Sequence, residues 1–243
     1  MEFDDIFLKT IDSTQDYAKK NVSSFDKKKI TCISAKEQTK GRGRFNREWL
    51  TEKDNNLSVT FCFQLKSKTL HLTSISHIIA LSFINCLRAK NLDPKIKWPN
   101  DVMLDNKKLS GVLCEIQTKN DISDVFLGIG INVNNSTEFL EKIDQRATSL
   151  KAFTNKTWDK DELLEILKKE FSKNLEMFNA KGFEPFHEEF ENLLLYKGEK
   201  ITFFDGQKQY IGCLHSISSD GKLNLYMPNK EMITFAAGDI INK

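Results

Sequence analysis

The stretch from Gly41 to Trp49 brings together the side chains best suited to hold an anionic ligand. Its sequence, Gly-Arg-Gly-Arg-Phe-Asn-Arg-Glu-Trp, contains three arginines, two glycines and a tryptophan. Guanidinium groups grip carboxylate and phosphate oxygens in pairs, and glycine lets the backbone approach a ligand closely. The tryptophan ring offers a flat face for a base. The stretch is therefore either a loop that folds over a small anion or an exposed basic loop without a ligand.

A second stretch, Lys97-Trp98-Pro99-Asn100-Asp101, favours the first interpretation. Lys97 ends an apolar strand, where a lysine is costly unless an anion meets it, and Trp98-Pro99 stiffens the following turn. A lysine at a strand end can also simply extend its ammonium group into solvent. Beside an Arg/Gly loop, a rigidly held lysine favours a phosphate site.

Several familiar catalytic motifs are absent from the sequence. It contains neither a Walker G-x-x-x-x-G-K-[ST] sequence nor a G-x-G-x-x-G that opens a helix after a strand, so neither of those nucleotide-binding modes is supported. It also lacks H-E-x-x-H and G-x-S-x-G, and no convincing protein nucleophile is present. A reaction that needs none is the attack of a substrate carboxylate on the α-phosphate of ATP, for which the protein supplies positioning and positive charge.

The loop and the lysine must be positioned by regular elements, and the apolar patterns predict a mixed α/β region up to about Tyr196. Asp12-Ser13-Thr14 is a helix start. The expected strands are 4–9, 30–35, 57–65, 95–98, 102–104, 109–116 and 125–133, and the expected helices are 72–90, one that starts at Asp159, and 183–196. Gly128 and Gly130 weaken their strand unless something passes close to the backbone.

The pattern changes after Lys197. Short runs at 201–204, 209–217, 222–227 and 231–235 are separated by Asp205-Gly206, Asp220-Gly221 and Pro228-Asn229-Lys230. Asp-Gly between alternating runs is a strong hairpin signal. We therefore expect a first domain over residues 1–196 and a small antiparallel β domain over residues 197–243.

Composition narrows the functional class. The chain has 243 residues, a net charge of +2 from 36 basic and 34 acidic side chains, and 40% hydrophobic residues. This balance argues against a dedicated DNA-binding protein and against a disordered chain. The five cysteines form no C-x-x-C pair, which favours free thiols in a reducing compartment. With no signal peptide and no membrane-length apolar run, a soluble cytoplasmic protein is expected.

Four motifs in order resemble the biotin–protein ligase family. They are Gly41-Arg42-Gly43-Arg44 with Trp49, Lys97-Trp98-Pro99-Asn100-Asp101, Lys108-Leu109-Ser110-Gly111-Val112-Leu113-Cys114-Glu115, and Gly128-Ile129-Gly130-Ile131-Asn132-Val133. Asp12-Ser13-Thr14 and Ala147-Thr148-Ser149-Leu150 also resemble family segments. Each motif alone is modest, but four at the right spacing are specific, and the resemblance extends over essentially the whole chain.

The resemblance implies an α+β fold, with a mixed sheet flanked by helices as in class II synthetases and a small C-terminal SH3-like β-barrel. It implies a biotin–acetyl-CoA-carboxylase ligase that uses ATP and Mg²⁺. Biotin and ATP would give biotinyl-5′-AMP, and the biotinyl group would then pass to a lysine of the biotin carboxyl carrier protein of acetyl-CoA carboxylase. A monomer and a homodimer both remain open, and no metal ligands are assigned.

The resemblance also implies roles for particular residues. The biotin-binding set would be Ser13, Thr14, Gln38, Arg42, Gly43, Arg44, Lys97 and Gly111. The ATP-binding set would be Arg44, Arg47, Trp49 and Asn132. Lys97, Arg42 and Arg44 would be the catalytic cations, because biotin's carboxylate and the α-phosphate repel each other until positive charge lies between them. Loop 41–48 would close over bound biotin.

The sequence departs from the family in three places. Gln15 stands where many members have Asn, and Phe45 stands where a further basic residue can occur. Only a dozen residues precede Ser13, which leaves no room for a helix-turn-helix domain, so ligase activity without DNA binding is expected. Two alternatives stay open: a lipoate or octanoate ligase of the same superfamily, and an RNA-binding module, which the charge balance disfavours.

Overall fold

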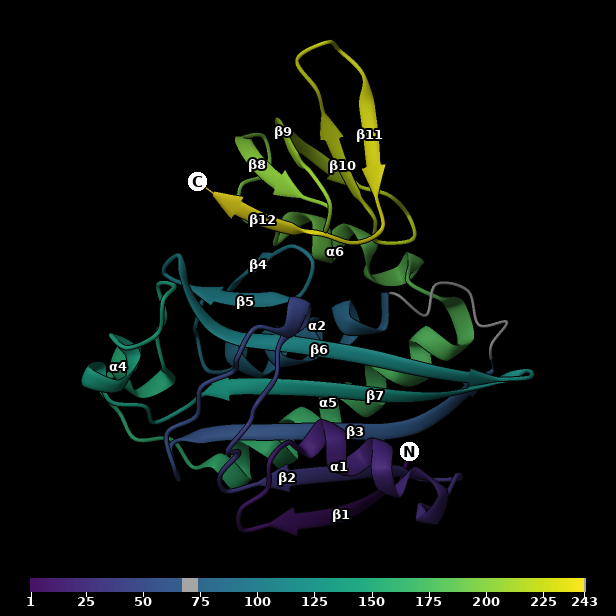
Figure 1. Ribbon diagram of the computed structural model, residues 1–243, viewed down its shortest axis with the longest axis vertical. Helices are drawn as coiled ribbons and strands as arrows, with labels where there is room; N and C mark the ends of the chain where they lie inside the picture. Colours follow the sequence, from purple (N-terminus) through teal and green to yellow (C-terminus); the bar gives the residue numbers. More distant parts are fainter. Residues whose placement is uncertain (67–73, 243) are drawn as a thin grey trace.

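The computed structural model describes residues 1–66 and 74–242, and its centre is a seven-stranded mixed sheet (Figure 1). The strand order is β1-β2-β3-β7-β6-β5-β4. β1 and β2 run parallel, and the other neighbouring strands pair antiparallel. The strands are β1 Phe3–Leu8, β2 Ile30–Ala35, β3 Asn56–Lys66, β4 Lys95–Lys97, β5 Asp101–Leu104, β6 Lys107–Lys119 and β7 Ile122–Asn132.

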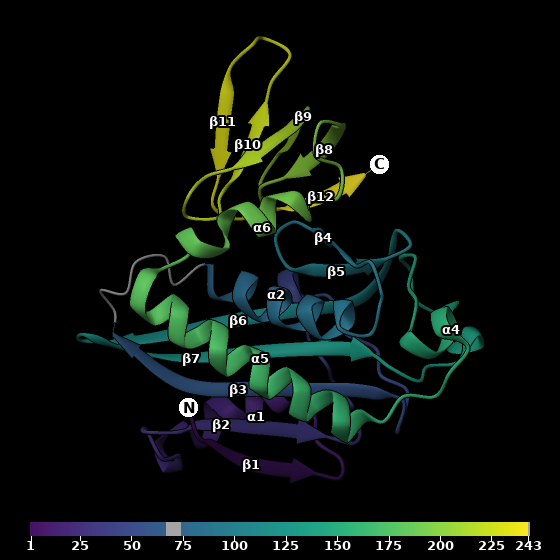
Figure 2. The ribbon, with the colours of Figure 1, turned by 180° about the vertical axis from the view of Figure 1, so that it is seen from behind.

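Helices cover both faces of this sheet, which is why β3 is buried along nearly its whole length rather than on alternate residues. Helix α1, Thr14–Asn21, lies on one face and is capped by Ser13, as predicted. Helices α2, Ile75–Arg88, and α5, Lys160–Lys181, pack against each other on the opposite face (Figure 2). The short helices α3, Thr137–Leu140, and α4, Leu150–Thr154, follow β7.

The main core lies between the sheet and the α2–α5 layer, and aromatic rings dominate it. Phe171 of α5 is fully buried, and its ring centroid lies 5.0 Å from that of Phe61 and 5.9 Å from that of Phe63, both on β3. Large rings at such distances add specific ring–ring attraction to the burial of apolar area. Phe171 therefore joins α5 to strand β3.

A second, five-stranded antiparallel sheet stands beside the β4–β5 edge of the first (Figure 1). Its order is β11-β10-β9-β8-β12. The indole nitrogen Nε1 of buried Trp98 donates to the Gly221 carbonyl at 3.0 Å, so the two sheets are joined by a buried hydrogen bond. The strands are β8 Lys200–Phe204, β9 Gln209–Ile217, β10 Leu223–Tyr226, β11 Met232–Phe235 and β12 Asp239–Asn242.

The predicted fold class is confirmed, with two differences in detail. The helix expected over 183–196 is shorter: a 3₁₀ turn, Glu184–Phe186, precedes α6, His187–Asn192. It ends there because the next residues pair with β4, where Ile96 N donates to Leu193 O and Leu195 N donates to Ile96 O. Strand β12 was not predicted. Residues 72 and 73 of the expected helix 72–90, and His71, lie outside the described residues.

In the described part of the chain, no helix combines the length and the apolar character needed to cross a membrane. The predicted boundary between residues 196 and 197 stays a prediction, although the second sheet begins just after it, at Lys200.

Replacement of Phe171 by alanine tests the proposed core. Phe171→Ala should lower the free energy of unfolding by about 3–5 kcal/mol, because it leaves a cavity between α5 and β3. The matched control is Phe7→Ala on the edge strand β1, where the ring is 66% exposed, and it should change stability by no more than ~0.5 kcal/mol. Urea unfolding followed by circular dichroism measures both, and equal effects would contradict the core assignment.

Candidate functional site

A cleft opens over strands β3, β6 and β7 on the face that carries α1, and loop 41–49 lies across it. Of the residues predicted to bind biotin, all but Lys97 line this cleft: Ser13, Thr14, Gln38, Arg42, Gly43, Arg44 and Gly111. Its free volume is only about 80 Å³. Loop 41–49 supplies part of its wall, through Arg42, Gly43, Arg44, Arg47, Glu48 and Trp49.

One end of the cleft is closed by a polar network without charged groups. The Gln38 carbonyl oxygen Oε1 accepts from the backbone nitrogen of Thr14 at 2.8 Å and from its hydroxyl at 3.0 Å. Thr14 Oγ1 lies 2.9 Å from Thr60 Oγ1, and Thr60 donates to Gln15 Oε1 at 3.2 Å. Convergent hydroxyl and amide groups in a largely buried pocket suit a neutral heterocycle with its own donors and acceptors.

Gln15, which stands where many members of the resembled family have Asn, belongs to this network. Its amide nitrogen Nε2 donates to the Phe126 carbonyl at 2.9 Å, so the side chain crosses β7. A Cβ atom on Gly128 would lie 2.8 Å from Gln15 Oε1. Gln15 can take this position only because residue 128 has no Cβ atom, and both residues line the cleft.

Loop 41–49 is a short hairpin-like turn. Trp49 N donates to Gly41 O at 2.9 Å, and Gly43 N donates to Arg47 O at 2.8 Å. The tip, Arg44–Asn46, is a 3₁₀ turn in which Phe45 has a left-handed φ of 55°. Gly41 is required because a Cβ atom there would lie 2.4 Å from the Trp49 carbonyl oxygen.

The Trp49 indole lies on a platform made by two paired glycines. Gly111 of β6 and Gly130 of β7 are opposite each other, and a Cβ atom on Gly130 would lie 2.4 Å from Trp49 Cε2. The prediction that something passes close to the β7 backbone is thus confirmed for Gly128 and Gly130. Among the described residues, Trp49 Nε1 is one of a few buried polar atoms without a hydrogen-bond partner.

Each loop arginine has a partner on a different element. Arg42 Nη2 lies 2.5 Å from Asp16 Oδ1 of α1 and 3.5 Å from Glu115 Oε2 of β6. Arg44 Nη2 donates to the Gly238 carbonyl at 2.9 Å, and burial lowers the pKa of this guanidinium. Arg47 Nη1 lies 2.5 Å from Asp239 Oδ2 of β12. Ion pairs of Arg42 and Arg47 therefore hold the two sides of the loop, and Arg44 and Arg47 connect it to the C-terminal sheet.

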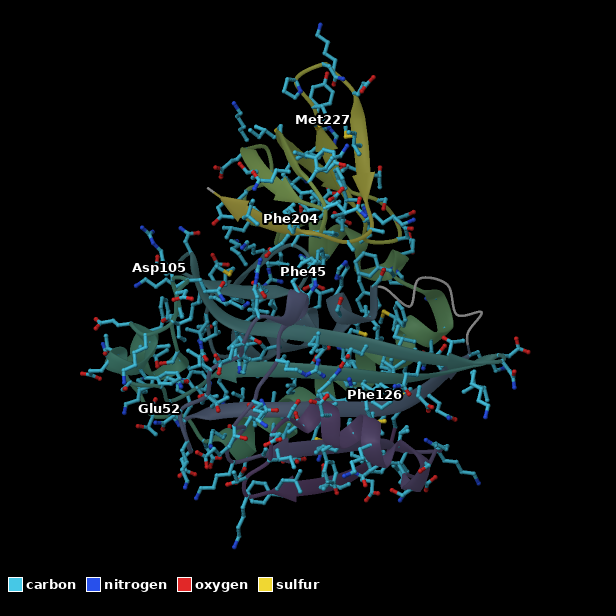
Figure 3. The ribbon with its side chains drawn as sticks, in the orientation of Figure 1. Phe45, Glu52, Asp105, Phe126, Phe204 and Met227 are labelled. Atoms are coloured by element: carbon cyan, nitrogen blue, oxygen red, sulfur yellow. The ribbon has the colours of Figure 1, made fainter. Side chains whose placement is uncertain are left out.

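Phe45 strengthens the contact with the C-terminal sheet. Its ring centroid lies 6.2 Å from that of Phe204 on β8, and the two side chains meet between the loop and the second sheet (Figure 3). The Arg44 guanidinium lies 5.0 Å from the centre of the Phe45 ring. Phe45, which stands where a basic residue can occur, therefore makes an aromatic contact between the loop and the second sheet.

Lys97 was the predicted fixed ammonium, and a second lysine, Lys108, lies closer to the cleft. Lys97 Nζ lies 3.7 Å from Asp239 Oδ1 and does not line the cleft as the described residues define it. Lys108 does line it: its ammonium lies 2.9 Å from Asp101 Oδ1 and 5.6 Å from the centre of the Trp49 ring. Lys108 is the lysine that reaches the centre of the site.

A β-bulge explains why Lys108 faces the cleft. Val102 pairs with Ser110 and Met103 pairs with Lys108, so Leu109 is an extra residue in β6. In a regular strand, Lys108 and Gly111 would point to opposite faces, since they are three residues apart. The bulge reverses this alternation, and both residues line the cleft.

A second cavity of about 590 Å³ adjoins the cleft, and three of the predicted ATP-binding residues line it: Arg47, Trp49 and Asn132. The two spaces share a wall made by Arg47, Glu48, Trp49, Lys108 and Gln145. Asn132 is buried, donates to the Thr148 carbonyl at 3.1 Å and accepts from Asn56 at 2.9 Å. Arg44, the fourth predicted ATP residue, lines the cleft rather than this cavity.

Four charged residues line the cleft that the sequence did not assign to the site: Glu48, Asp101, Lys108 and Asp239. Lys108 was part of a recognised motif, but its direction depends on the bulge. Asp239 lies on the unpredicted β12. Across the described ranges, no group of three or more His, Cys, Asp or Glu side chains is placed to hold a metal ion.

Comparison with known proteins places this geometry among ligases. The model of the biotin/lipoate A/B protein ligase family matches residues 7–132, more than half of the chain. The bifunctional ligase/repressor BirA of Escherichia coli is 28% identical over 220 residues, which cover 90% of this chain and 68% of that protein. The biotin–acetyl-CoA-carboxylase ligase of Paracoccus denitrificans is 28% identical over 214 residues, which cover 84% and 88%.

Solved structures agree over nearly the full length. Biotin protein ligase from Aquifex aeolicus in complex with biotin and ATP superposes with a TM-score of 0.85 and 33% identity, covering 99% of each chain. The same protein without ligand gives a TM-score of 0.81 at 30% identity.

The glycine platform is open to a direct test. Gly130→Ala should displace the Trp49 ring, because the new methyl group would overlap Cε2. The tryptophan emission should move to longer wavelength, and this shift should vanish in a Trp49→Phe background. Gly43→Ala is the control, since its nearest neighbour would be 3.5 Å away. An unchanged emission spectrum for Gly130→Ala would show that the ring does not rest on this glycine.

Proposed function

The chain belongs to the biotin/lipoate A/B protein ligase family and is an enzyme of the ligase class, and we propose that it uses ATP to convert biotin into biotinyl-5′-AMP. It then transfers the biotinyl group to a lysine of a biotin carboxyl carrier protein. One observation carries this proposal: two cavities share a wall that includes Arg47, Trp49 and Lys108. The first has an uncharged polar end, and residues predicted to bind ATP line the second.

Biotin lies in the cleft with its ureido ring at the closed end. Ser13, Thr14 and Gln38 supply the uncharged donors and acceptors there, together with Gln15 and Thr60. The carboxylate then points to the opposite end of the cleft, where Arg44, Arg47 and Lys108 gather. Gly111 and Gly130 form the floor, and Arg42 and Gly43 belong to the loop that covers the bound molecule.

The adenosine of ATP lies in the second cavity, against Trp49 and Asn132. Its α-phosphate reaches the shared wall, where it meets biotin's carboxylate. Arg44, Arg47 and Lys108 place positive charge between these two anions. The protein thus accelerates the reaction by positioning and electrostatic stabilisation, without a covalent bond to the substrate. Mg²⁺ accompanies the ATP phosphates and adds charge neutralisation there.

Lys97 has an indirect role in this arrangement. It shares Asp239 with Arg47, so it competes for the carboxylate that holds the loop arginine. This differs from the expectation that Lys97 itself contacts biotin's carboxylate and the α-phosphate, and the two roles are distinguished below.

In the second half-reaction, the carrier's lysine attacks the acyl carbon of the mixed anhydride and AMP leaves. Residues 1–196 form the domain that performs both steps, and residues 197–243 form a smaller domain that anchors the loop through Asp239, Gly238 and Phe204. Closure of loop 41–48 keeps water away from the anhydride between the steps.

The mass of a biotin carboxyl carrier domain measures the complete reaction. After incubation with this protein, ATP, Mg²⁺ and biotin, the carrier should gain one biotinyl group on one lysine. Lipoate in place of biotin tests the alternative within the family. Labelling with lipoate but not with biotin would refute the proposal.

The assignment of the central lysine predicts unequal effects of two substitutions. Lys108→Ala should slow biotin-dependent pyrophosphate release by about 100- to 1,000-fold, ~3–4 kcal/mol, as expected for a charge donor to the transition state. Lys97→Ala should have a smaller effect, because Lys97 does not line the cleft and its ammonium contacts Asp239, which does. A larger loss for Lys97→Ala would restore the direct role expected from the sequence.

A further inference from the structure

A closed ring of four charges fastens one side of loop 41–49 to the body of the protein. Two members lie on α1, one lies on β6 and one lies on the loop. In order around the ring they are Asp16, Arg42, Glu115 and Lys19, so that negative and positive groups alternate. We call these residues the four-charge ring.

Arg42 makes the closest contact within the ring. Its guanidinium meets both oxygens of Asp16, with Nη2 at 2.5 Å from Oδ1 and Nε at 3.3 Å from Oδ2, and Nη2 lies 3.5 Å from Glu115 Oε2. A guanidinium that contacts both oxygens of one carboxylate is held in direction as well as in distance. The loop is therefore fastened mainly to α1, through Asp16.

Lys19 and Arg42 neutralise the same two carboxylates. The Lys19 ammonium lies 3.0 Å from Glu115 Oε1 and 3.3 Å from Asp16 Oδ1. Asp16 and Lys19 are three residues apart on one helix, so they stay neighbours when the loop moves. Departure of Arg42 then leaves one negative charge unbalanced. Without Lys19 it would leave two, and unlike charges would hold Arg42 more strongly.

We propose that Lys19 is a positioning residue that weakens the hold of the four-charge ring on Arg42, and thereby sets how fast loop 41–49 lets its ligand leave. This inference rests on the proposed function, in which the loop covers biotinyl-5′-AMP between the two half-reactions. Asp16 and Glu115 fasten the loop over the intermediate. Lys19 loosens it, so that the product can leave.

The other side of the loop has the same arrangement. Arg47 and Lys97 share the carboxylate of Asp239, at 2.5 Å and 3.7 Å respectively. On each side, an arginine of the loop shares its carboxylate partner with a lysine outside the loop. The loop can therefore open without leaving either carboxylate group entirely unpaired.

The exposure of the four-charge ring suits a contact that breaks and re-forms. Its side chains range from 25% exposed for Lys19 to 50% exposed for Asp16. Water can therefore solvate the separated charges, which keeps the cost of opening modest. A fully buried ring would leave charges that the protein solvates poorly, and the loop would open rarely.

The dissociation rate of biotinyl-5′-AMP measures this hold. Chemically prepared, tritiated biotinyl-5′-AMP is bound to the protein, unlabelled compound is added in excess, and the retained label is followed by filter binding. Asp16→Asn should raise the rate about fivefold and Lys19→Gln should lower it about threefold, the scale of partly exposed ion pairs. The opposite signs are the decisive result, because loss of a purely structural ring would affect the rate in the same direction in both variants.

A second set of variants tests whether both residues act through Arg42. In an Arg42→Gln background, Asp16→Asn and Lys19→Gln should each change the rate by less than about twofold, because the coupled partner is gone. Lys20→Gln, exposed on the same helix, and Asp121→Asn, exposed between β6 and β7, are the charge-matched controls. Both should retain the wild-type rate.

Two results would overturn the proposal. One is dissociation from Lys19→Gln that is as fast as from the wild type, or faster, in protein that is folded by circular dichroism. The other is an equal effect of Lys19→Gln with and without Arg42. A wild-type protein that binds biotinyl-5′-AMP but does not make it from biotin and ATP would instead contradict the proposed function, so the two failures are distinguishable.

Discussion

The site depends on keeping its positive charges paired while no ligand is present. Arg42 is held by Asp16 and Glu115, Arg47 and Lys97 share Asp239, and Lys108 pairs with Asp101. Removing one partner of a half-buried pair leaves a charge that the surrounding protein solvates poorly. The cations are therefore pre-positioned by carboxylates, and a bound anion must take over those contacts rather than create new ones.

The second constraint is the close approach of side chains to the strands. Gly111, Gly128 and Gly130 leave room on β6 and β7 for Trp49 and Gln15, which would otherwise collide with a methyl group. The same indole lines both the cleft and the second cavity. A loop residue thus separates two spaces above the sheet, and its position depends on glycines in the strands below it.

Much of this could be predicted from the sequence because the signals are local. Strand β2 was predicted with its observed limits, Ser13 caps α1, and Asp159 caps α5. The Arg/Gly loop and Gly111 were placed together by their motifs. What failed depends on tertiary context. The bulge in β6 that turns Lys108 into the cleft leaves no local signal, and the short strand β12 is fixed by pairing with β8 rather than by its own sequence.

The position of β12 has a consequence for how the site forms during synthesis. Domains generally fold as they emerge, with the N-terminal part first, and strands β1 to β7 all precede residue 133. Asp239 follows more than a hundred residues later. A nascent chain can therefore assemble its central sheet while Arg47 still lacks this carboxylate, and during that interval the loop is a cationic segment without its counter-ion. Formation of β12 ends this interval, so the contact between Arg47 and the second sheet forms later than the contacts of Arg42 with Asp16 and Glu115.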